Sequence, residues 1–128
     1  MKILPVYAAL LALLFVFLSV RTIRMRRRLH IGIGDAENPV MLRAMRVHAN
    51  FAEYVPMGLL LAFFVETSGA PQLLVHALGA SLLVGRIAHA FGVSREPEDF
   101  RFRVFGMVLT FTALLLSALY LLAMSLAK

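Results

Sequence analysis

Four long apolar stretches, separated by turn-forming residues, constrain this chain more than any other feature. They begin near Ile3, Pro39, Pro71 and Glu98 of a chain of 128 residues. A helix needs about 20 mostly apolar residues to cross the hydrocarbon core of a bilayer. Hydrophobic residues make up 61% of the chain and charged residues only 16%, a composition unlike that of a soluble domain. The sequence therefore predicts an all-α integral membrane protein with a single transmembrane domain over residues 1–128.

The predicted architecture is a four-helix bundle, and its topology follows from where the arginines lie. We expect helices at roughly residues 3–23, 39–67, 71–92 and 98–126, with Asn38 as the N-cap of the second helix and Pro39 at its first helical position. The arginines lie in the connections after the first and third helices or in the helix segments beside them, whereas the only charged residue near the middle turn is Glu66. The positive-inside rule then places both basic connections in the cytoplasm and both termini on the non-cytoplasmic side. Only Lys2 precedes the first stretch, and no small-residue cleavage site is evident, which disfavours a signal peptide.

Charge and cysteine usage exclude several functions. The net charge of +6 is concentrated in two connections and lacks an accompanying basic and aromatic platform, so we expect a lipid-bilayer partner and no nucleic acid. The chain has no cysteine, which excludes disulfides, a cysteine nucleophile and cysteine metal sites. We expect no metal site, and any thiol chemistry must use a thiol that the substrate supplies.

The beginning of the second helix carries a polar stripe. A helix advances by about 100° per residue. One face therefore collects two cations, an amide, a carboxylate and a phenol, from Arg43, Arg46, Asn50, Glu53 and Tyr54. On the same helix His48 points about 200° away from Arg46. Ionisable groups within a membrane span are costly, so this stripe is a candidate functional site.

Two other helices bring ionisable groups to the same predicted membrane depth. Arg86 and His89 lie at the end of the third helix, and Arg101 and Arg103 lie at the start of the fourth. An antiparallel bundle would bring these groups close to the stripe. The excess of arginine suits an anionic ligand, because the guanidinium fork matches a carboxylate. The alternative is that the charges pair with one another and hold the helices in register.

The motifs of the second and third helices resemble those of a known family. The relevant segments are Gly34-Asp35, Asn38-Pro39, Arg43-Ala44, Arg46, His48-Ala49-Asn50, Glu53-Tyr54, Pro56 and Gly85-Arg86-Ile87-Ala88-His89. The segments up to Pro56 closely resemble the signature of the membrane-associated proteins in eicosanoid and glutathione metabolism, the MAPEG family. The segment Gly85–His89 resembles the third-helix motif of the prostaglandin E synthase branch of that family, and the chain as a whole resembles a bacterial-type member. The resemblance covers nearly the whole chain.

The resemblance implies a fold, a co-substrate and roles for particular residues. It implies a homotrimer of four-helix subunits, with glutathione bound between neighbouring subunits as co-substrate. Its matches for glutathione binding are Arg46, His48, Asn50, Glu53, Tyr54, Arg86 and His89. The best match to the family's thiol-activating arginine is Arg103, here a candidate catalytic residue. The implied reaction joins the glutathione thiolate to a lipophilic small molecule from the bilayer, as a transferase or peroxidase.

Differences between this chain and the family pattern keep other residue roles and other functions open. Several relatives have a tyrosine where this chain has Val93, and Arg101 could take the role of Arg103, from which it lies about 200° away. The family includes a noncatalytic scaffold, so a member that only binds lipid or glutathione is an alternative function. A small four-span transporter with Glu53 as coupling carboxylate is a third possible function, disfavoured because nearby arginines would oppose proton coupling at that carboxylate.

Overall fold

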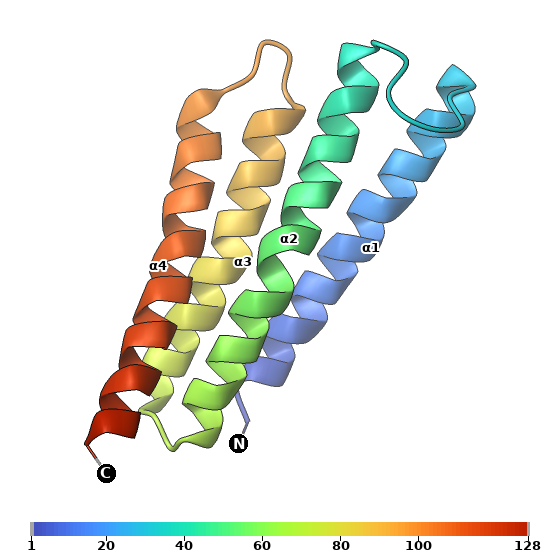
Figure 1. Ribbon diagram of the computed structural model, residues 1–128. Helices are drawn as coiled ribbons and strands as arrows, with labels where there is room; N and C mark the ends of the chain where they lie inside the picture. Colours follow the sequence, from blue (N-terminus) through green and yellow to red (C-terminus); the bar gives the residue numbers. More distant parts are fainter. Residues whose placement is uncertain (1, 128) are drawn as a thin grey trace.

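Four long antiparallel helices make up the computed structural model, which describes residues 2–127 (Figure 1). They are α1 (Leu4–Leu29), α2 (Pro39–Thr67), α3 (Gln72–Ser94) and α4 (Phe100–Leu126). The α1–α2 and α3–α4 connections lie at one end of the bundle, here named the loop end, and the α2–α3 turn lies at the other (Figure 1). All four helices are long and apolar enough to cross a membrane. The predicted all-α membrane four-helix bundle is confirmed.

Polar side chains fix where three of the helices begin. The Asn38 side chain accepts hydrogen bonds from the backbone N–H groups of Val40 and Met41 at the start of α2, as predicted for an N-cap. Asp99 does the same for Arg101 at the start of α4. The first turn of α1 is capped from another helix, because the Glu66 carboxylate accepts hydrogen bonds from the N–H groups of Ile3 and Leu4.

The predicted end of the first helix is wrong. We expected α1 to end near residue 23, but it continues to Leu29 and includes the arginine run. Arginine is a good helix former, and cations in the last turn interact favourably with the helix dipole. The α1–α2 connection is therefore the shorter segment 30–38, and Arg26 donates to the carbonyl oxygen of Gly34 at 2.9 Å within it. Similarly, α4 begins at Phe100 instead of residue 98, because Asp99 is its N-cap.

The bundle is tightest where α3 meets α4. The apolar core includes Leu11, Phe51 and Leu82, which join α1, α2 and α3. On the other side, a Cβ added at Gly85 would lie 2.8 Å from the backbone oxygen of Gly106, so the two helices touch through their backbones. Small residues allow such close approach in membrane bundles. This contact brings the end of α3 that carries His89 directly against the start of α4.

Candidate functional site

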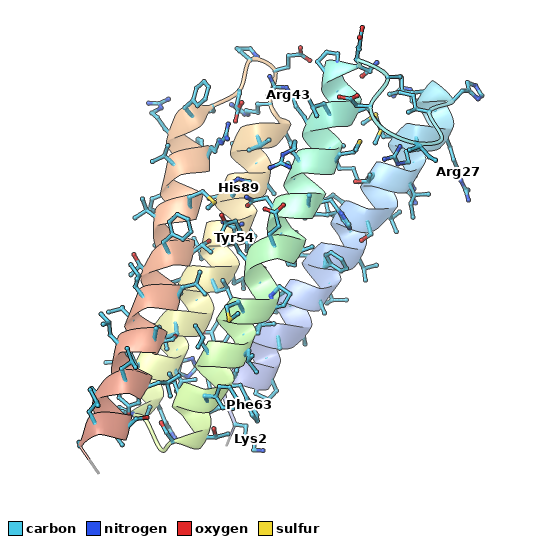
Figure 2. The ribbon with its side chains drawn as sticks, in the orientation of Figure 1. Lys2, Arg27, Arg43, Tyr54, Phe63 and His89 are labelled. Atoms are coloured by element: carbon cyan, nitrogen blue, oxygen red, sulfur yellow. The ribbon has the colours of Figure 1, made fainter. Side chains whose placement is uncertain are left out.

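A groove of about 260 Å³ opens at the loop end between α2, α3 and α4. Its polar lining comes from Arg43, Arg46, Asn50, His89, Glu98 and Arg103, and its apolar lining from Pro39, Leu42 and Val93. Arg43 and His89 both lie in the half of the bundle nearer the α3–α4 connection, and Tyr54 lies deeper (Figure 2). We refer to this cavity as the arginine groove.

Four of the eight predicted site residues meet in the arginine groove. Arg46 and Asn50 come from α2, His89 from α3 and Arg103 from α4. The antiparallel arrangement brings these segments together, because the start of α2, the end of α3 and the start of α4 all lie at the loop end. His89 is buried, whereas Arg46 and Arg103 are exposed. The groove therefore has arginines at its rim and an imidazole at its wall.

The Glu98 carboxylate connects two of the groove's arginines. Its Oε1 accepts a hydrogen bond from Nη1 of Arg103 at 2.8 Å, and its Oε2 accepts one from Nη1 of Arg43 at 3.3 Å. Arg43 also donates to the backbone oxygen of Val93 at 3.3 Å. Only 14% of the Glu98 side chain is exposed, so these charged contacts are partly shielded from water. Glu98 thus ties α2 and α4 to the α3–α4 connection.

Arg86 lies beneath the groove, within the bundle. It is 1% exposed, and its Nη1 donates to Oδ1 of Asn50 at 2.6 Å while Nη2 donates to the backbone oxygen of Gly106 at 3.4 Å. Its guanidinium carbon lies 5.7 Å from the centre of the Tyr54 ring, which in turn packs edge-on against Phe111 of α4. Arg86 and Tyr54 therefore do not line the groove, and Arg86 contacts its lining through Asn50.

His48 and Glu53 lie outside the groove. Nε2 of His48 is 3.0 Å from Oγ of Ser19, and its ring stacks on Phe15 with centroids 4.9 Å apart, so it faces α1. The expected direction of His48, away from Arg46, is confirmed. Glu53 is exposed on α2, and within residues 2–127 neither Glu53 nor Arg46 forms an ion pair. The polar stripe is thus divided between the groove and the outer surface of α2.

The structure separates the two candidate arginines of α4. Arg103 lines the groove, whereas the Arg101 side chain is 91% exposed, pairs with Asp99 at 3.6 Å and lies outside it. Sequence reasoning missed Glu98, which precedes Arg103 by five residues in the connection. The signal available was an acidic residue next to a predicted cluster of arginines. Val93 is buried against the groove.

The charge of the groove defines the ligands it suits. Arg43, Arg46 and Arg103 contribute three positive charges, and Glu98 contributes one negative charge. Such a groove favours a ligand with carboxylates and a net negative charge, because arginine binds carboxylates through two parallel hydrogen bonds. The chain itself offers no thiol.

Comparisons with known proteins identify the family of this chain. The MAPEG family model matches residues 4–123. The chain is 38% identical over 113 residues to the inner membrane protein YecN of Escherichia coli K12, covering 88% of this chain and 85% of that protein, and the match to YecN of Escherichia coli O6:H1 is the same. No solved structure matches significantly. With this family match over nearly the whole chain and four helices able to span a membrane, the protein is an integral, multi-pass membrane protein of the MAPEG family.

Proposed function

We propose that the protein is a membrane-embedded glutathione transferase that joins the thiolate of glutathione to a lipophilic electrophile from the bilayer. One observation carries the proposal: Arg46, Asn50, His89 and Arg103, from three separate helices, line a single groove at one end of the bundle. Membership of the MAPEG family supports glutathione as the ligand.

The groove offers a role for each charged group. We assign Arg43 and Arg46 to the carboxylates of glutathione, and we expect Glu98, which pairs with Arg43, to release the arginines when the ligand enters. A free thiol has a pKa of about 8.5 and is mostly protonated at neutral pH, whereas only the thiolate attacks well. A guanidinium beside the sulfur, here assigned to Arg103, favours the anion by about 1.4 kcal/mol for each unit of pKa lowering. The thiolate then attacks an electrophilic carbon held nearby.

A homotrimer is part of the proposal. Arg46 and Glu53 are exposed on α2, and Glu53 lies within the span, about 21 Å along the helix from Pro39. An unpaired carboxylate facing lipid at such a depth is costly. A neighbouring copy that covers this face of α2 would shield Glu53 and would enclose glutathione between two subunits.

The test is glutathione binding followed by conjugation. Calorimetry on the purified protein in mild detergent should show binding that Arg46→Ala weakens by about ten- to a hundredfold, since a charged hydrogen bond contributes about 1.5–3 kcal/mol. The matched control is Arg27→Ala, which removes the same charge from the loop end but lies on α1, away from the groove (Figure 2).

Conjugation is then measured with a chlorodinitrobenzene electrophile. Formation of the thioether with release of chloride supports the transferase. Binding without conjugation of this or other generic electrophiles identifies a noncatalytic glutathione-binding member of the family. If glutathione does not bind, or if Arg46→Ala and Arg27→Ala weaken it equally, the groove is not its site.

A further inference from the structure

One face of α1 carries a row of side chains that is apolar toward the start of the helix and basic toward its end. Its apolar residues are Val6, Leu10, Leu13 and Phe17, all between 44% and 69% exposed. Its basic residues continue the same spacing of four, three and four positions, at Arg21, Arg24 and Arg28. Residues at this spacing share one side of a helix. The opposite side of α1 carries the residues buried in the bundle, Leu4, Leu11 and Leu18.

A hollow of about 260 Å³ lies where the apolar and basic parts meet. We name it the α1 hollow, and its lining is Phe17, Val20, Arg21, Arg24, Met25 and Arg28. Its walls are therefore hydrocarbon on the side nearer the middle of the span and guanidinium groups on the side nearer the loop end.

The arginines of this helix end are not equivalent. Arg21 donates to Oγ of Ser94 at 2.7 Å, and Arg26 donates to backbone oxygens of the α1–α2 connection. Arg24 and Arg28 are exposed, and within residues 2–127 they form no ion pair or hydrogen bond through their side chains. Two guanidinium groups one helical turn apart thus border the hollow with their charges uncompensated.

We propose that the α1 hollow binds an anionic glycerophospholipid of the surrounding bilayer. Its phosphodiester lies between Arg24 and Arg28, whose forked N–H groups match phosphate oxygens. One acyl chain runs down the line of Phe17 and Leu13. The rise from Leu13 to Arg24 is about 16 Å, close to half of a hydrocarbon core about 30 Å thick, which is the depth of one leaflet. The inference does not depend on glutathione binding.

The apolar and the basic part of this face lie at different membrane depths, and this order favours a lipid over a second copy of the chain. A protein surface covering this face would have to present hydrocarbon beside Phe17 and anions beside Arg24 and Arg28. The acids nearest the loop end, such as Asp35, Glu37 and Glu96, lie in the connections beyond the helices. An anionic phospholipid presents both groups in the required order, and basic clusters at membrane interfaces attract such lipids.

The experiment measures which lipid the protein retains. The full-length protein is reconstituted in nanodiscs with equal amounts of phosphatidylglycerol and phosphatidylcholine, released into mild detergent, and its bound lipids are identified by native mass spectrometry. We expect at least a tenfold preference for phosphatidylglycerol. The variant Arg24→Gln/Arg28→Gln should lose that preference. The control Arg95→Gln/Arg101→Gln, which removes two exposed charges from the same end of the bundle, should keep it.

A second variant separates specific recognition from general attraction. Arg24→Lys/Arg28→Lys keeps the charge and the helix propensity but removes the guanidinium fork, so it should retain less than half of the preference. Full retention in this variant, or equal losses in both glutamine pairs, would show diffuse attraction and overturn the site. An unchanged preference in Arg24→Gln/Arg28→Gln would overturn it as well.

Two further outcomes would assign the face to another occupant and overturn the proposal. Loss of oligomer mass in Arg24→Gln/Arg28→Gln, without a change in bound lipid, would make this face a contact between copies. Displacement of phosphatidylglycerol by millimolar inorganic phosphate would make the hollow a site for a free anion. We expect the lipid to remain bound in phosphate, because its acyl chain contributes apolar contacts along α1.

Discussion

Glu98 holds the guanidinium of Arg103 at 2.8 Å with one carboxylate oxygen while the other accepts from Arg43. The residue proposed to activate the thiol is therefore paired with an internal anion. A ligand with carboxylates has to compete with Glu98 for both arginines. This gives the groove a measurable balance between internal pairing and ligand binding.

Removing the charge of Glu98 should shift that balance toward the ligand. We expect Glu98→Gln to bind glutathione more tightly, by up to about tenfold, which corresponds to about 1.4 kcal/mol. Calorimetry at low and high salt measures this, and the gain should shrink at high salt because of screening. Glu96→Gln is the matched control, since Glu96 is exposed and does not line the groove. Weaker binding by Glu98→Gln would mean that Glu98 positions the arginines or binds the ligand's ammonium group.

Arg103 should separate chemistry from binding. We expect Arg103→Ala to keep glutathione affinity within about tenfold, because a group that stabilises the thiolate acts mainly on ionisation. Conjugation should fall by about 10²-fold or more, the usual cost of losing one preorganised charge contact. The thiolate absorbance of bound glutathione at neutral pH should fall as well.

Arg101→Ala is the internal control for this prediction. Its side chain is almost fully exposed and lies outside the groove, so the change should have little effect. If Arg101→Ala abolishes conjugation while Arg103→Ala spares it, the assignment of the activating arginine is reversed. An activity that neither change alters would rule out the thiolate mechanism.

The protein should be a trimer in mild detergent. The prediction follows from the exposed Glu53 and Arg46 on α2 and from the family to which the chain belongs. Native mass spectrometry across several detergents measures the mass of the assembly. Finding only monomers or dimers would contradict a site enclosed between subunits.

The close contact of α3 and α4 should not tolerate a side chain at Gly106. A Cβ there would meet the backbone of α3 at Gly85 and His89, so Gly106→Ala should destabilise the protein by about 1–3 kcal/mol. Thermal unfolding in detergent measures the loss. Gly32→Ala is the control, because nothing lies within 4 Å of the added Cβ and the melting temperature should stay unchanged. Equal melting temperatures for the two variants would mean that the helices separate easily.

Local patterns were sufficient for the helices and for directions within one helix. Hydrophobic length predicted four spans, and Asn38 followed by Pro39 predicted the start of α2. The angular position of His48 correctly predicted that it points away from Arg46. These features depend on neighbours within a few residues. The end of α1 was missed because a run of arginines was interpreted as a loop, although arginine extends a helix well.

Only the packing of the helices decided which polar groups share the site. Arg86 and Arg103 are the same residue type, and the sequence does not distinguish their surroundings. In the structure Arg86 is buried and donates to Asn50, whereas Arg103 lines the groove. That difference depends on how closely α3 approaches α4, which the backbone contact of Gly85 with Gly106 sets. The four spans could be predicted from the sequence because hydrophobicity and helical period act along one segment. The partners of the charged side chains could not, because the distance between two helices depends on the residues of both.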